Sequence, residues 1–105
     1  AGDDDSAFGA IRALQLAGCI VPQDVSVVGF DDVPFARYLS PRLTTVRAPI
    51  EQIGREAVHQ LVRQLNGEQA NALTLMRTEL IIRESCGCMP ESLNVNDGAR
   101  SSTRR

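Results

Sequence analysis

The 105-residue sequence contains no lysine, and all 11 of its basic residues are arginines, against 13 acidic residues. A Walker-type phosphate loop and a receiver-type acidic pocket both need a lysine, so neither kind of site is expected. With a net charge of −2 and a pI of about 5.3, the chain is not a polycation built to hold nucleic acid. No apolar run approaches the length of a membrane span and no signal peptide is recognisable. We therefore expect a cytoplasmic protein without a membrane partner.

Cysteine and histidine are also scarce. The chain has three cysteines, Cys19, Cys86 and Cys88, and one histidine, His59. An odd number of cysteines without regular spacing does not form a disulfide framework, and the Cys86-Gly-Cys88 pair lacks the second ligand pair of a structural zinc site. We expect reduced thiols, with Cys19 in the core, no metal and no cofactor. A redox or metal role of Cys86 and Cys88 is the minor alternative.

Enzymatic activity has little support in the residues. The sequence has no GxGxxG motif for a dinucleotide, and no serine or cysteine close to His59 suggests a catalytic triad. We interpret His59 as a residue on the surface of a helix or at an interface. The protein is therefore predicted not to be an enzyme. Enzymatic activity is kept only as a third alternative for its function.

The first thirty residues show a helix, loop and strand pattern. Apolar residues recur at the spacing of one helical face between Asp4 and Gly18. Asp4 or Asp5 can cap the first turn, and Gly18 can end the helix. After a connection that contains Pro22, residues 25–30 form the apolar run VSVVGF, which is typical of a strand covered on both faces of a parallel sheet. This pattern predicts an α/β fold.

Shorter elements follow in the second half of the chain. Pro34 can start a brief helical turn, and the alternation in LTTVR, residues 43–47, predicts a short strand. LTLMRTELIIRES, residues 73–85, predicts one last strand. Residues 87–105 have no periodicity and are predicted to be a disordered tail.

The longest predicted helix begins at Pro49 and ends at Asn66-Gly67. Its polar residues fall on one side and its apolar residues on the other, as in a helix that buries one stripe. The stripe that we expect to be buried consists of Ile50, Ile53, Ala57, Val58, Leu61 and Leu65.

Two groups of carboxylates stand where open α/β sheets bind ligands. Asp31 and Asp32 directly follow the strand predicted at 25–30, and three further acids, Asp3 to Asp5, precede the first helix. Ligands of such folds bind just beyond the carboxyl ends of the strands. A carboxylate recognises paired hydroxyls or amines because it accepts two hydrogen bonds. The alternative, that these acids are helix caps and solvated turn residues, carries more weight for Asp4 and Asp5 than for Asp31.

Four stretches, in this order and at these separations, resemble the carboxyl-terminal part of a LacI/GalR-family transcriptional regulator: AFGAIRALQLAG, VPQDVSVVGFDDVPFARYLSPRLTTVR, PIEQIGREAVHQLV and TELIIRESC. The most specific part is SVVGFDD followed by LTTVRAP. The resemblance implies two α/β lobes like those of periplasmic binding proteins, with parallel sheets flanked by helices and crossover strands around an effector cleft. Residues 1–86 are then expected to be the carboxyl-terminal part of an effector-binding and dimerisation domain, a fragment of a larger protein.

The resemblance also implies ligand-binding residues. Asp31 matches the position whose carboxylate contacts the effector, and Asp3 matches a cleft position that is usually Asn or Asp. Asp32 is expected either to assist at the ligand or to support the hinge. Phe35 is expected near the cleft mouth, packed on a sugar or base, or alternatively in the core. The expected effector is a sugar, a sugar derivative, or a nucleobase or nucleoside.

The implied mechanism is allosteric. A small molecule between the lobes favours one lobe arrangement and so changes the spacing or order of two DNA-reading heads in a homodimer, most often a repressor. Operator DNA is expected to be contacted only through an amino-terminal helix-turn-helix domain outside this chain. A periplasmic sugar-binding protein of a transport system, which shares the fold, is the alternative.

The resemblance divides the chain between the two lobes. LTTVR is expected to cross to the first lobe, the helix from Pro49 to pack there, and TELIIRES to return to the second lobe. Pieces of both lobes are then present without the sheet that completes them. We therefore expect the isolated chain to aggregate or to intertwine with a second copy.

Overall fold

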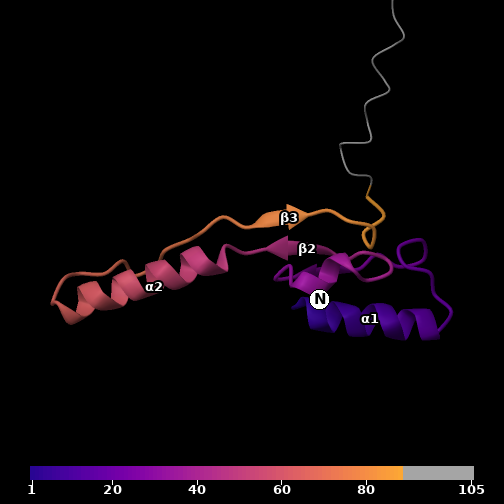
Figure 1. Ribbon diagram of the computed structural model, residues 1–105, viewed down its shortest axis with the longest axis horizontal. Coiled ribbons are helices and arrows are strands. Elements are labelled where there is room, and N and C mark those ends of the chain that lie inside the picture. The colour runs from indigo at the N-terminus through magenta and orange to yellow at the C-terminus, as the bar shows by residue number, and fades with distance from the viewer. Residues whose placement is uncertain (89–105) are drawn as a thin grey trace, which may run out of the picture.

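A computed structural model describes residues 1–88 of the chain (Figure 1). Two helices, three strands and one 3-10 turn follow in the order α1 Asp4–Leu16, β1 Val28–Phe30, the turn Pro34–Arg37, β2 Thr44–Arg47, α2 Ile50–Leu65 and β3 Glu79–Ile81. Helices alternate with strands of a single sheet, which confirms the predicted α/β class. Most of the tail predicted at 87–105 lies outside the described residues.

The three strands form one sheet in the order β1-β2-β3. β1 pairs with β2 in parallel, with Val28 opposite Thr44, and β3 pairs with β2 in antiparallel, with Arg47 opposite Glu79. The parallel pairing expected of the first strand is present, and β3 adds an antiparallel edge. β2 and β3 together are called the β2/β3 ribbon below.

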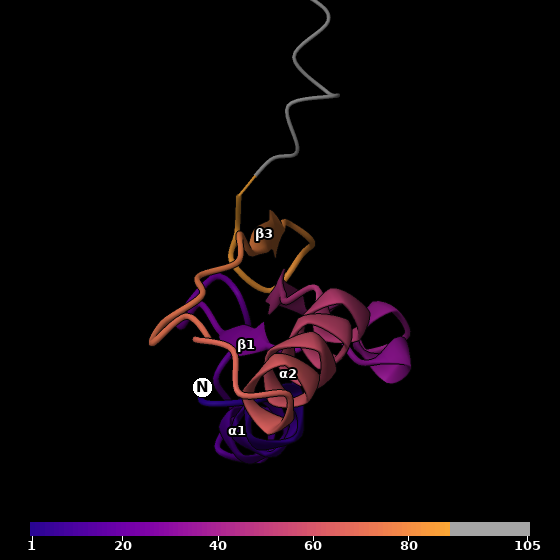
Figure 2. The ribbon, with the colours of Figure 1, turned by 90° about the vertical axis from the view of Figure 1, so that its left-hand side faces the viewer.

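The β2/β3 ribbon joins two separate regions of the molecule. Figure 1 shows α1 and the first part of the chain at one end of the ribbon and α2 at the other, and Figure 2 shows the same arrangement from the α2 end. α1 packs against β1, whereas α2 makes no extensive contact with any described helix or strand. The arrangement fits a strand pair that crosses from one lobe to another.

The hydrophobic core lies in the region of α1 and β1. Its buried members are Ala7, Ile11, Val21, Val27, Ala36 and Leu43. Cys19, which was expected in the core, is only half-buried. The core is small because, among the described elements, a single helix, α1, packs against the sheet.

Two of the predicted strands are shorter than their sequence patterns. In β1 only Gly29 is buried, and Val28 and Phe30 are each 37% exposed, so the expected cover on both faces is absent among the described residues. The last strand does not extend before Glu79. Its register continues toward residues 48 and 49 of the partner strand, where Pro49 leads into α2 and has no N–H to donate.

The buried stripe predicted for α2 is wrong for the described part of the chain, since none of its helical residues is buried. Leu61 is 54% exposed and Leu65 is 77% exposed. The amphipathic pattern is real, but no described helix or strand packs extensively against the helix. His59 is exposed on this helix, as expected.

Candidate functional site

Asp31 stands directly after β1 in an unusual backbone conformation. Its φ is 107°, and its N–H donates to the Val46 carbonyl at 2.8 Å, which holds the end of the strand. A non-glycine residue in a sparsely populated region costs about 1–3 kcal/mol, and such residues cluster at functional sites. The side chain is exposed, and Asp31 forms none of the ion pairs found within residues 1–88. Its carboxylate is therefore free to meet a ligand.

Asp32, its neighbour, is held inside the molecule. Its side chain is 2% exposed and forms ion pairs at 2.6 Å with both Arg47 and Arg83. Burial acts to raise the pKa of Asp32, but the hydrogen bonds and charges of Arg83 and Arg47 outweigh it and lower the pKa below its ordinary value. The carboxylate is thus ionised and fully occupied by arginines, so Asp32 is not available for direct contact with an effector.

The two arginines connect Asp32 to both strands of the β2/β3 ribbon. Arg47 is the last residue of β2, and Arg83 follows shortly after β3. Arg83 also donates to the Leu43 carbonyl at 2.8 Å and is itself largely buried. The loop after β1 is therefore fixed to the outgoing and the returning strand at once.

Asp4 is a fully buried carboxylate, contrary to the expectation of a cap or a solvated residue. It accepts a hydrogen bond from the Thr45 hydroxyl at 2.6 Å and another from the Val33 N–H at 2.9 Å. Gly29 leaves the space for it, because a Cβ on Gly29 would collide with a carboxylate oxygen of Asp4. These bonds draw the first turn of α1 against the loop after β1.

Asp3, not Asp4 or Asp5, is the residue that caps α1. Its side chain accepts a hydrogen bond from the Ser6 N–H at 2.6 Å. Hydrogen bonds from the backbone and the hydroxyl of Ser6 hold the pKa of Asp3 below its ordinary value. One carboxylate oxygen serves as the cap, so the other can still accept a bond from a ligand.

Phe35 lies in the turn Pro34–Arg37 and contacts an aromatic residue of α1. The rings of Phe35 and Phe8 pack edge to face, with centroids 6.2 Å apart and an interplanar angle of 68°. Both side chains keep exposed surface, 36% for Phe35 and 47% for Phe8. The core alternative for Phe35 is therefore not what the structure shows.

The structure places the four predicted site residues at one end of the α1 and β1 region. Asp31 and Phe35 are exposed there, Asp3 starts α1 at the same end, and Asp32 lies beneath the surface. Phe8, which stands one helical turn after Asp4, was not among the predicted site residues. Neither were Arg47 and Arg83, and the buried role of Asp4 was not expected, because no local pattern gives a signal for partners so far apart in the sequence.

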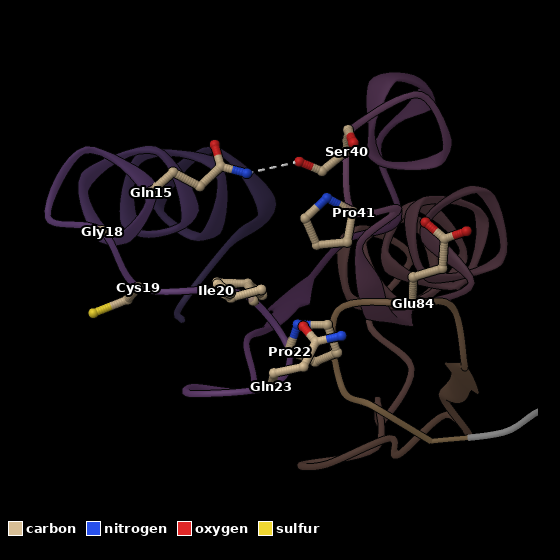
Figure 3. A pocket seen from close by; sticks show the side chains of 10 residues that line it. Gln15, Gly18, Cys19, Ile20, Pro22, Gln23, Ser40, Pro41 and Glu84 are labelled. Carbon is tan, nitrogen blue, oxygen red and sulfur yellow. Dashed lines mark hydrogen bonds between the residues drawn. The ribbon is translucent and has the colours of Figure 1, made fainter.

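One surface depression of the described chain lies away from these residues. It has a volume of about 590 Å³ and lies at the opposite end of α1, between Gly18, Pro22, Pro41 and Glu84 (Figure 3). One wall is fixed by the Gln15 side chain, which donates to the Ser40 carbonyl at 2.9 Å. None of the predicted ligand-binding residues lines it.

Within residues 1–88 no three His, Cys, Asp or Glu side chains come together as a metal site. No helix in the same part of the chain is long and apolar enough to cross a bilayer.

Comparison with known proteins gives matches over most of the chain. Residues 1–86 match the family described as periplasmic binding protein-like domain. A lactose operon repressor of Rhizobium radiobacter is 45% identical over 85 residues, which cover 81% of this chain and 75% of that protein. The transcriptional repressor MelR of Bacillus subtilis is 42% identical over 81% of this chain and 25% of its own length.

A solved structure is also similar to this chain. The complex of the transcriptional regulator CelR with cellobiose superposes with a TM-score of 0.73 at 39% identity, covering 80% of this chain and 26% of that one. The chain thus spans about a quarter of the length of CelR and of MelR. Together with the α/β architecture and the strand pair that links two regions, these matches show that the chain belongs to the LacI family of transcriptional regulators, within the periplasmic binding protein-like domain.

Proposed function

We propose that this chain is the effector-sensing part of a transcriptional regulator and binds a small polyhydroxylated molecule beyond the carboxyl end of β1. The observation that carries the proposal is the contrast between two adjacent carboxylates. Asp31 is exposed at a φ of 107°, whereas Asp32 is held by two arginines. The Asp31 carboxylate forms no ion pair within residues 1–88 that stabilises it in this conformation, and a ligand contact would account for its exposed position.

A sugar or sugar derivative is the effector class that fits these residues. Each oxygen of the Asp31 carboxylate can accept a hydrogen bond from a sugar hydroxyl, and a ligand without that hydroxyl leaves the charge without a partner. The exposed rings of Phe35 and Phe8 offer an apolar surface for the C–H face of a sugar ring. The relative CelR, whose structure contains cellobiose, supports this choice.

Asp3 is proposed as the second polar contact of the effector. Because its pKa is lowered by Ser6, the carboxylate stays ionised at neutral pH and remains an acceptor. Its position at the start of α1 places it at the same end of this region as Asp31.

Asp32 is proposed to act on the hinge and not on the ligand. Its ion pairs reach the end of β2 and the segment after β3, the two places where the chain passes between the two regions. An effector that holds Asp31 also restrains the loop that Asp32 anchors, so binding can bias the arrangement of the ribbon. A coupling of about 1–3 kcal/mol is typical of such a switch.

DNA binding is proposed to reside in another part of the protein. Residues 1–86 are proposed to form the carboxyl-terminal part of the effector-binding domain. We propose that a homodimer presents two helix-turn-helix heads to operator DNA in the bacterial cytoplasm, most simply as a repressor. The relatives are regulators and not transport proteins or enzymes, which disfavours those alternatives.

The test is the substitution Asp31→Asn in the full-length regulator. It keeps the shape of the side chain and removes the charge, so we expect release of operator by a panel of sugars to be lost or weakened by about tenfold to a hundredfold, as for a charge-assisted hydrogen bond of 1.5–3 kcal/mol. Operator affinity without sugar is expected to be unchanged. Asp5→Asn, at an exposed position of α1, is the matched control.

The measurement is operator binding by fluorescence anisotropy, titrated with each sugar. An unchanged sugar response in Asp31→Asn contradicts the proposed site. If Asp31→Asn loses operator binding without sugar while Asp5→Asn keeps it, the proposed ligand role is also contradicted, because Asp31 then serves folding or assembly.

A further inference from the structure

The segment after β3 carries two thiols that the proposed function does not use. Cys86 is half-buried and Cys88 is exposed, and both are free cysteines. They are separated only by Gly87, so each thiol has the other as its nearest partner along the chain.

The backbone between the two cysteines forms a turn at Gly87. Gly87 has a φ of 73°, which favours glycine, and its N–H donates to the Glu84 carbonyl at 3.1 Å to close a turn. The Cys88 N–H then points to the Cys86 Sγ at 3.2 Å, and the Cys88 thiol lies 3.9 Å from the Cys86 carbonyl. The turn thus brings the sulfur atom of each cysteine close to the backbone of the other.

The turn is anchored to the core on its amino-terminal side. Ser85 is fully buried, donates to the Val27 carbonyl at 2.6 Å, and accepts the Thr44 N–H at 2.8 Å. The Ser26 hydroxyl donates to the Cys86 carbonyl at 3.0 Å. Cys86 is therefore held in place, while Cys88 lies at the exposed end of the turn.

We propose that Cys86 and Cys88 form a reversible dithiol-disulfide pair that reacts with small-molecule disulfides of the glutathione class. Cys86 is the attacking thiol and Cys88 the resolving thiol. The Cys86 thiolate attacks one sulfur of the oxidised molecule, forming a mixed disulfide and releasing one thiolate. The Cys88 thiol then loses its proton and attacks the Cys86 sulfur, which releases the second small thiol. The protein gives up two electrons and two protons, and one disulfide becomes two thiols.

The ionisation of the two thiols is consistent with these roles. Partial burial acts to raise the pKa of Cys86, but hydrogen bonds from Cys88, from the Thr44 hydroxyl and from backbone N–H groups outweigh it and leave the pKa lowered. The hydrogen bond to Cys86 raises the pKa of Cys88. Of the two thiols, Cys86 is therefore the one that loses its proton more readily to give the nucleophilic thiolate.

The pair is expected to be easily reduced again. A disulfide between residues two apart closes a small, strained ring, and strained or exposed disulfides are the labile ones that serve in regulation and not in stabilisation. The fraction of the protein that carries the Cys86–Cys88 disulfide should therefore follow the thiol-disulfide balance of the surroundings.

The test treats the full-length regulator with oxidised glutathione and follows its peptides by mass spectrometry. Trypsin cuts after Arg83 and Arg100, so both thiols leave in a single peptide, 84–100, which loses two hydrogens when the disulfide forms. We expect a mixed disulfide with glutathione to accumulate at Cys19 but not on this peptide, because the tethered second thiol attacks the mixed disulfide at a high effective concentration. A reductant such as dithiothreitol should restore both thiols.

Three variants separate the roles. In Cys88→Ser, Cys86 is expected to retain glutathione as a stable mixed disulfide, whereas in Cys86→Ser the uptake at Cys88 should be slower. Gly87→Ala keeps both thiols and disfavours the turn, so disulfide formation should slow while glutathione uptake continues. Cys19→Ser is the matched control and should leave the pair unaffected.

Some outcomes would overturn the proposal. These are independent glutathione uptake at all three cysteines of the wild type at similar rates, or oxidised products that join two chains and not Cys86 to Cys88. Equal rates in Cys86→Ser and Cys88→Ser would refute the assignment of the attacking thiol.

Discussion

The aspartates Asp3, Asp4, Asp31 and Asp32 differ in role because their surroundings differ. Asp4 and Asp32 are buried and hydrogen-bonded to residues far away in the sequence, whereas Asp31 faces solvent. Sequence position predicted that acids gather beyond the end of β1, but it did not distinguish the structural acids from the exposed one. That distinction depends on Thr45, on Arg83 and on the other distant partners that the fold brings to each carboxylate.

The buried position of the Asp4 carboxylate requires that residue 29 carries no Cβ atom, as in Gly29. We expect Gly29→Ala to lower the free energy of unfolding of the full-length protein by about 1–3 kcal/mol, the usual cost of overpacking. Its Cβ would meet an oxygen of Asp4 and come within 3.0 Å of a methyl carbon of Leu43. Asp4 would have to move and give up its bond to Thr45.

Gly9→Ala is the control for this substitution, measured by the same urea denaturation. Gly9 lies within α1 and a Cβ there meets nothing within 4 Å, so the change is expected to stabilise by about 0.5–1 kcal/mol through helix propensity. Equal effects of the two substitutions would show that the contact between Gly29 and Asp4 is not tight.

At the scale of elements, local sequence signals predicted the positions of α1, the 3-10 turn, β2 and α2. These are elements whose starts and ends are marked by nearby residues, such as Pro34, Pro49 and Gly18. The lengths of β1 and β3 could not be obtained in that way. A strand ends where its partner stops offering hydrogen bonds, and for β3 this is set by Pro49, thirty residues earlier in the chain.

The β2/β3 ribbon depends on Asp32, and this gives a pH-dependent prediction. At neutral pH we expect Asp32→Asn to destabilise the full-length protein by about 3 kcal/mol, the lower end for a buried ion pair, because Arg47 is half-exposed. The folded-state pKa of Asp32 is lowered, so its contribution is complete above about pH 5 and is lost as the pH falls through the folded pKa.

The difference in unfolding free energy between wild type and Asp32→Asn should therefore shrink in acid. Urea denaturation at a series of pH values measures it, and Asp5→Asn, at an exposed position, should change stability by less than about 0.5 kcal/mol throughout. A difference that stays constant or grows on acidification would mean that Asp32 is not the titrating partner of the two arginines.

At the scale of the whole molecule, the most prominent feature is the exposed apolar side of α2. Large apolar patches on a protein surface mark places that another surface covers. Leu61 and Leu65 lie on this helix, and Leu73 and Leu75 in the segment after it are 74% and 84% exposed. In the complete regulator we expect the first lobe to cover this surface.

The isolated 105-residue chain is accordingly expected to self-associate at micromolar concentration, which size-exclusion chromatography with light scattering can measure. The double substitution Leu61→Gln and Leu65→Gln should reduce the association, because both side chains are more than half-exposed. Arg55→Gln, at an exposed polar position of the same helix, should not. A monodisperse monomer with a sharp, cooperative thermal transition would contradict this expectation.

The pairing of Arg47 with Glu79 means that the chain departs from the α1 and β1 region and comes back to it at neighbouring points. Residues 48–78 therefore leave this region and return to it, and the two ends of this segment lie as far apart as two adjacent strands. A tight two-residue turn could bridge that gap as it does in any hairpin. The path of the chain in the α1 and β1 region is therefore set by the pairing of β2 with β3, whatever the length of the segment between them.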